Sequence, residues 1–359
     1  MPVKKFRLEW LDAMRGFTMI MVVAYHVALQ GFNIQFKGSS SLPFLVLFRM
    51  PLFFFVSGFL AYRASQVWNL RELGRLLLKK LRVQVVPTVV FFLFATAVLC
   101  RQSHFSDEMM TRLASPTKGG YWFTIVLLYM FIVYYVFSYV VSKLRVPAWL
   151  AFSLLFIVSL CCYETCYLPR QFAWAQGHWT NRNEFMDTSS VVQLFYYFPF
   201  FLYGNLVHRY WAGAQRVMDS RWFYPLVVVL AIFCTMDVLK WHTLRLEWTN
   251  LPLTMAKFCL LTMVFMYFRH YEKYFTKMTW VGRSLQYIGR RTLDIYLIHF
   301  LFMPNLPDVG AYFKMNQHNF VMDTTLSVLI GLLIIGFSII TSNILRVSPF
   351  FKKYLFGRS

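Results

Sequence analysis

The chain has 359 residues, of which 58% are hydrophobic and 14% are charged, and its mean hydropathy is +0.51. Soluble globular proteins carry about 25% charged residues, so the composition excludes an ordinary soluble domain and is typical of a membrane protein. The net charge of +21 favours basic loops that set the membrane topology, together with a site for an anionic ligand. No nucleic-acid partner is expected, because no long soluble segment could present a basic face.

Apolar segments long enough to cross a bilayer occur throughout the chain. A spanning helix needs about 20 mostly apolar residues, and no soluble domain of useful size fits between these segments. We therefore predict an all-α protein with a single domain over residues 1–359, a polytopic membrane helix bundle of about ten transmembrane helices. The predicted spans are 11–31, 44–62, 83–100, 121–141, 147–164, 190–208, 222–240, 252–268, 285–303 and 324–345.

The orientation follows from the distribution of Lys and Arg, which are in excess in cytoplasmic loops. If the N-terminus lies inside, 24 of the 36 Lys and Arg residues fall on the inner side and nine on the outer side. This bias predicts that both termini are cytoplasmic.

The first span, EWLDAMRGFTMIMVVAYHVALQGF, contains Asp12, Arg15 and His26. On a helix, His26 lies within about 20° of Arg15 and about 40° of Asp12, and about 16 Å along the axis from Arg15. The three groups form a polar stripe from the cytoplasmic edge past the midplane, and such intramembrane groups indicate function. Two alternatives remain, an Asp12–Arg15 ion pair whose Arg reaches the lipid head groups and a buried His26 bonded to a neighbouring helix.

The second span contains RMPLFFFVSGFLAYR, in which Pro51 and Gly58 interrupt an aromatic helix. Ser57 and Gly58 allow close approach by a ligand or by another helix, the latter being ordinary small-residue packing.

The segment that follows this span is basic. Arg75, Lys79 and Arg82 recur at intervals of four and three residues, so they share a helical face that could hold phosphate groups. The alternative is a topology signal that also contacts anionic lipid head groups.

The segment YIGRRTLDIYLIHF, residues 287–300, carries a second intramembrane imidazole. Thr292, Tyr296 and His299 fall on one face, and Asp294 lies elsewhere and can pair with a neighbouring Arg. His299 has two alternative roles, a structural hydrogen bond between helices and a catalytic role, and the sequence favours the catalytic role no more than the structural one.

Together these segments resemble the membrane acyltransferase family 3. The resemblance runs in order from residue 8 to about residue 345 and is carried by WLDAMRGFTMIMVVAYH, MPLFFFVSGFL, the basic segment ending at Pro87, YWFTIVLLYMF, FPFFLYGNLV and IGRRTLDIYLIHF. It implies an O-acyltransferase in the inner (plasma) membrane that moves acetyl from acetyl-CoA to a hydroxyl of a surface or secreted glycan. The family's functional Arg and His of the first span correspond to Arg15 and His26, and its basic motif corresponds to Lys79 and Arg82.

From the residues and the resemblance we expect the phosphates of acetyl-CoA, as co-substrate, to be held by Arg15, Lys79, Lys80 and Arg82. We expect no metal ion and no permanently bound cofactor, because the six cysteines are scattered without a CxxC pair or a His-rich partner. The expected partners are the acyl-CoA donor, the glycan acceptor and the lipid bilayer.

For the reaction itself, His26 is expected to act as general base on the acceptor hydroxyl or as a transient acyl carrier. Asp12 is expected to position the first-span Arg, while Ser57, Tyr296 and His299 are candidates for substrate binding. The rival hypothesis is a transporter or flippase for a glycan or lipid-linked intermediate, which would also need intramembrane charge and a polar passage.

Overall fold

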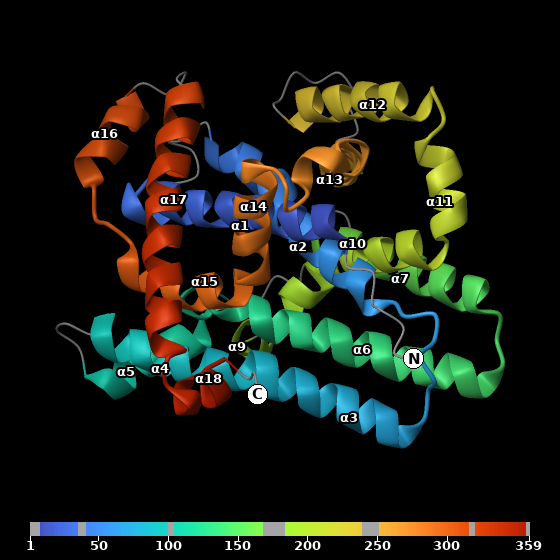
Figure 1. The fold of residues 1–359 in the computed structure, drawn as a ribbon, viewed down its shortest axis with the longest axis horizontal. Helices are drawn as coiled ribbons and strands as arrows, with labels where there is room; N and C mark the ends of the chain where they lie inside the picture. Colours follow the sequence, from blue (N-terminus) through green and yellow to red (C-terminus); the bar gives the residue numbers. More distant parts are fainter. Residues whose placement is uncertain are drawn as a thin grey trace. The chain divides into compact units, whose positions relative to one another are not determined.

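The structure of the protein is a computed structural model. It describes residues 8–34, 41–99, 104–115, 117–167, 184–238, 251–315 and 320–356, which Figure 1 colours in chain order. All regular secondary structure in these residues is helical, which confirms the prediction of an all-α fold.

The chain forms two compact units, each assembled from distant parts of the sequence. The first unit comprises Met1–Phe53, Ser220–Ile232 and Ala256–Ile344, and the second comprises Phe54–Asp219, Phe233–Met255 and Leu345–Ser359.

The first unit is built around α1, which ends at His26 and continues directly into a single π-helical turn. Its core includes Ala24 of α1 packed with Leu45 and Phe48 of α2. The helices that lie wholly or partly in this unit are α1 (Glu9–His26), the π-helix η1 (Val27–Gly31), α2 (Ser41–Ala61), α12 (Phe223–Val238), α13 (Leu251–His270), η5 (Glu272–Phe275), α14 (Trp280–Arg290), α15 (Thr292–Ile298), η6 (His299–Phe302), α16 (Pro307–Met315) and α17 (Phe320–Leu345).

The second unit has an aromatic core, in which the ring of Phe54 lies 5.0 Å from the rings of both Phe123 and Tyr197. Its further helices are α3 (Leu70–Lys80), the π-helix η3 (Leu81–Val85), α4 (Val86–Leu99), α5 (Phe105–Ala114), η4 (Lys118–Gly120), α6 (Trp122–Leu144), α7 (Ala148–Tyr167), α9 (Glu184–Ser189), α10 (Val191–Arg209), α11 (Trp211–Met218) and α18 (Pro349–Tyr354).

Five helices in the described part of the chain are long and apolar enough to cross a membrane. The count is six if α11 and α12, with a bend of 79° at the break between them, form one broken span. The five are Ser41–Ala61, Leu70–Val98, Trp122–Leu144, Leu251–His270 and Phe320–Leu345. The 18-residue α1 is not among them, and Glu9, Asp12 and Arg15 all lie in it. The bundle of ten spans and the cytoplasmic termini therefore stay predictions.

Two predicted boundaries differ from the structure. The predicted span 285–303 is not one helix, because α14 ends at Arg290, α15 begins at Thr292, and a 3₁₀-helix follows from His299. The basic segment after the second span is also not a separate loop, since α3, η3 and α4 run on as one helical stretch. Apolar periodicity detects both segments. It does not show where a helix is interrupted or where two helices are continuous, because these features depend on contacts of the backbone.

Glycines bring helix backbones into direct contact in both units. In the first unit α14 crosses α1 (Figure 1), and a Cβ on Gly289 would lie 1.8 Å from the carbonyl oxygen of Asp12. In the second unit a Cβ on Gly58 would lie 1.8 Å from the carbonyl oxygen of Phe201 in α10. At Gly58 the close neighbour is therefore another helix, as the small-residue alternative proposed.

We expect Gly289→Ala to destabilise the protein, because the added methyl group has no room beside the α1 backbone and the two helices must separate. Overpacking of this kind costs about 1–3 kcal/mol. Gly336→Ala is the matched control, since a Cβ there meets nothing within 4 Å. Thermal unfolding in detergent checks this, and equal midpoints for the two variants would contradict it.

Candidate functional site

Asp12 is the centre of a polar network at the N-terminal end of α1. Its carboxylate is buried and lies between two guanidinium groups, 3.9 Å from Nη1 of Arg15 and 3.5 Å from Nε of Arg290. The network arises because α14 crosses α1 at this level, which places Arg290 beside a carboxylate that belongs to another helix. Two cations beside one buried carboxylate compensate its charge, which offsets the free-energy cost of burying it.

Arg15 is bound on two sides. Its Nη2 donates a hydrogen bond of 2.9 Å to Oγ1 of Thr292, the first residue of α15, and its side chain is 28% exposed. The predicted Asp12–Arg15 pair is present, but it belongs to a network across three helices rather than to an isolated helix end.

His26 and His299 form a pair of imidazole rings in the same unit. Their centroids are 5.3 Å apart, and the ring of Phe300 lies 5.0 Å from that of His26. His26 is half-buried, and its buried Nδ1 has no hydrogen-bond partner among the described residues. The structure thus brings together two histidines that the sequence placed on separate helices. The π-helical turn follows His26 directly, and such turns are frequent at functional sites.

The hydrogen bonds of His299 fix its tautomer. Its Nδ1 lies 3.0 Å from the carbonyl oxygen of Ile295 and 2.8 Å from that of Tyr296. A carbonyl oxygen only accepts, so Nδ1 carries the proton and the fully buried Nε2 of the neutral ring is left as an acceptor. His299 therefore offers a lone pair next to His26.

Two further predicted residues of this region are buried. Tyr296 packs its ring 6.1 Å from that of His299. Asp294 accepts a hydrogen bond of 2.9 Å from Oγ of Ser342 in α17. Tyr296 thus borders the histidine pair, while its role in binding a substrate stays a prediction.

Arg49 is a buried cation to which the sequence analysis assigned no role. Its guanidinium carbon lies 3.4 Å from the centroid of the Tyr25 ring, and that ring lies 5.5 Å from the ring of His26. The signal for Arg49 in the sequence is an ionisable residue within the predicted second span, since such residues indicate function.

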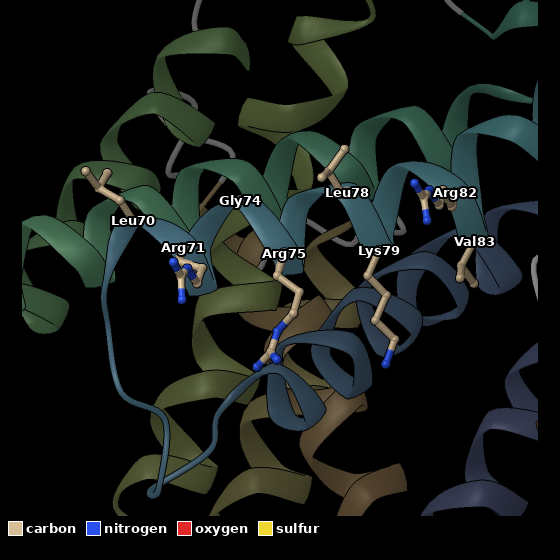
Figure 2. Close-up of a pocket in the computed structure, with 8 residues that line it drawn as sticks. All are labelled: Leu70, Arg71, Gly74, Arg75, Leu78, Lys79, Arg82 and Val83. Carbon is tan, nitrogen blue, oxygen red and sulfur yellow. The ribbon is translucent and has the colours of Figure 1, made fainter.

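A basic face lies on α3 and η3 in the second unit. Arg75, Lys79 and Arg82 line an open cavity of about 560 Å³, and Figure 2 shows Arg75 and Lys79 extending from the same side of the helix. Asn69 caps the N-terminus of α3, since its side chain accepts a hydrogen bond of 2.8 Å from the N–H of Glu72. Lys79 and Arg82 therefore share a face, as their spacing predicted.

Lys80 is not among the residues that line this cavity. Its ammonium group lies 3.3 Å from the centroid of the Phe131 ring in α6, in a cation–π contact. The binding of donor phosphates by Lys80 stays a prediction, and in this structure its charge is directed at an aromatic ring.

Ser57 belongs to the second unit, next to the close contact of Gly58 with α10. That contact continues with Asn205, whose Nδ2 donates to the carbonyl oxygen of Gly58 at 3.4 Å, and His208, whose Nδ1 donates to that of Phe59 at 2.6 Å. A substrate role for Ser57 stays a prediction.

Comparison with known proteins identifies one family. The model of the acyltransferase 3 family, described as an acyltransferase domain, matches residues 8–343, nearly the whole chain. No curated protein and no solved structure matches the chain. The match includes α1, α14 and α15, and it confirms the resemblance found in the sequence.

We expect Asp12 and Arg290 to be energetically coupled. In a double-mutant cycle of Asp12→Asn and Arg290→Gln, removal of the second partner should cost less than removal of the first, with a coupling of about 1 kcal/mol. Unfolding by titration with sodium dodecyl sulfate measures this. The cycle of Asp308→Asn with Arg290→Gln is the control and should be additive to within about 0.5 kcal/mol. Additivity in both cycles would contradict the network.

Proposed function

Since this chain belongs to the acyltransferase 3 family, we propose that it transfers an acyl group, acetyl in the usual case, from cytoplasmic acyl-CoA to a hydroxyl of a surface or secreted glycan. Family membership and the apolar helices together support a multi-pass membrane acyltransferase. The proposed location is the inner (plasma) membrane, because the acyl-CoA donor is cytoplasmic and the glycan acceptor is on or beyond the cell surface.

The observation that carries the proposal is the polar content of α1 and its neighbours. One helix holds a guanidinium network near its N-terminus and an imidazole at its last residue, about 16 Å further along the axis. Acyl transfer from a cytoplasmic thioester to an external hydroxyl needs both elements, an anchor for the anionic donor at one level and a base at another.

In the proposed reaction His26 removes the proton of the acceptor hydroxyl as its oxygen attacks the carbonyl carbon of the thioester. The C–O bond forms, the C–S bond breaks, and the thiolate of coenzyme A receives the proton from the imidazolium. General base catalysis of this kind contributes about 10²–10⁴-fold. In this reaction the acceptor Nε2 of His299, whose ring centroid lies 5.3 Å from that of His26, would stabilise the protonated form of His26.

A second chemical route uses the same residues. In it a ring nitrogen of His26 attacks the carbonyl carbon of the thioester, the C–S bond breaks, and coenzyme A leaves as the thiolate, which takes the imidazole proton. The acceptor hydroxyl then attacks the acyl-imidazole, so that the ester C–O bond forms, the C–N bond breaks, and the hydroxyl proton returns to the imidazole. In either route Asp12 and Thr292 hold Arg15, and Tyr296, His299 and Ser57 are the proposed substrate contacts.

For the donor, the basic face of α3 supports binding of phosphate groups by Lys79 and Arg82, with Arg71 and Arg75 beside them in the same cavity. Arg75 is ion-paired with Glu72 and contributes less charge. We omit Lys80 from this set because its ammonium group faces Phe131.

The rival function is a transporter or flippase for a glycan or lipid-linked intermediate. It requires a polar passage but no base, whereas the paired imidazoles favour chemistry on a hydroxyl. Glycan analysis of cells with and without the protein separates the two functions. Loss of a transferase leaves the glycan without one O-acyl group, whereas loss of a transporter leaves the cell without the surface glycan itself.

We expect His26→Ala to lower transfer of labelled acetyl from acetyl-CoA to glycan by at least about 10²-fold, because the base or acyl carrier is removed. The assay uses purified protein in nanodiscs, with insertion confirmed by size-exclusion chromatography. His270→Ala, an exposed histidine at the end of α13, is the control and should keep full activity. A fully active His26→Ala would exclude both routes.

We expect Arg82→Gln to weaken the binding of coenzyme A about tenfold, through loss of a charged hydrogen bond to phosphate. Isothermal titration calorimetry on purified protein measures this. Lys143→Gln, a basic residue at the end of α6 that does not line the cavity, is the control. Unchanged affinity of Arg82→Gln would return the α3 face to a role in topology or lipid contact.

A further inference from the structure

A second basic cavity lies in the first unit, against α14. It has a volume of about 530 Å³ and is lined by three cationic side chains, those of Lys277, Arg283 and Arg290, together with polar side chains of α14. No Asp or Glu lines it. Arg283 and Arg290 lie seven residues apart, with Tyr287 between them, and so share one face of the helix.

The cavity is continuous with the polar network of α1. Arg290 borders it and also forms the ion pair with Asp12, while Lys277 pairs with Glu9, the first residue of α1, at 3.3 Å. Gln286 fixes the arrangement, since its Nε2 donates to the carbonyl oxygen of Phe275 and its Oε1 accepts from Nη2 of Arg290, both at 2.7 Å. The cavity therefore lies at the Arg15 end of α1, opposite His26.

The charge that remains available in the cavity is that of Arg283. Arg290 shares its charge with Asp12 and Lys277 with Glu9, whereas Arg283 is exposed and forms no ion pair among the described residues. Ser284 and Tyr287 line the same cavity as Arg283. Guanidinium and hydroxyl groups both donate hydrogen bonds, and a phosphate group accepts several hydrogen bonds at once.

We propose that this cavity is a phosphate-binding site, in which Arg283 supplies the principal charge and Arg290 couples the bound phosphate to the Asp12–Arg15 network. Such a phosphate group has two sources, coenzyme A and the head group of an anionic lipid. Binding of coenzyme A here rests on the proposed function, and it would place the donor in the unit that holds His26 and His299. Binding of a lipid head group would instead anchor the N-terminal end of α1.

The test compares Arg283→Gln and Arg283→Lys with the wild type and with Arg216→Gln. Arg216 is an exposed arginine of α11 that lines neither of the two basic cavities. The full-length protein is placed in nanodiscs of phosphatidylcholine, and binding of coenzyme A is measured by calorimetry. In a second arm, native mass spectrometry measures phosphatidylglycerol retained by the protein after release from mixed-lipid nanodiscs.

If the phosphate comes from the donor, Arg283→Gln weakens the binding of coenzyme A about tenfold, Arg283→Lys less, and Arg216→Gln not at all. If it comes from the lipid, affinity for coenzyme A is unchanged and only Arg283→Gln loses retained phosphatidylglycerol.

The proposal is overturned if Arg283→Gln matches the wild type in both arms, or if Arg216→Gln loses as much in the arm that responds. Failure of the proposed function gives a different result, in which the wild type binds no coenzyme A. Retention of phosphatidylglycerol by Arg283→Gln then tests the phosphate-binding site by itself.

Discussion

The polar architecture of the first unit depends on backbone contact between α1 and α14. Glycines on both helices make it possible, Gly289 against the carbonyl of Asp12 and Gly16 against that of Leu285. With the helices this close, Asp12 can meet Arg290 and Arg15 can reach Thr292. Larger residues at the crossing would separate the partners and leave ionisable groups unpaired in an apolar protein, which is costly. The ion pairs and hydrogen bonds between these helices thus depend on the glycines at their crossing.

The histidine pair shows how the same unit sets the chemistry of a buried group. His299 follows the last residue of α15, and its Nδ1–H donates to the carbonyl oxygens of Ile295 and Tyr296 in the last turn of that helix. The ring is thereby held in one orientation and one tautomer, with Nε2 as an acceptor. The helix break that the sequence did not locate therefore places His299 at the position where its side chain makes these two hydrogen bonds.

Much of this could be predicted from sequence, and the reason for each miss is physical. The common face of Asp12, Arg15 and His26 follows from helical geometry alone, which holds because α1 is regular up to His26. The pairing of His26 with His299 and of Asp12 with Arg290 is tertiary, so periodicity within one helix carries no information about it. Lys80 differs from its neighbours in sequence, because Lys79 and Arg82 line an open cavity whereas the side chain of Lys80 faces an aromatic ring.

The network also constrains what Arg15 can do. Its guanidinium already donates to Thr292 and lies beside Asp12, so a phosphate group would compete with a carboxylate for its charge. A cation in this position would bind an anion weakly. It would still respond to a phosphate bound by Arg290, because Arg290 would then move away from Asp12 and Arg15 would be the remaining partner of that carboxylate. If the donor is coenzyme A, as proposed, arginines without a buried carboxylate partner, such as Arg283, would supply its affinity better. Arg15 would then link occupancy of the cavity at the N-terminal end of α1 to the position of the helix that ends in His26.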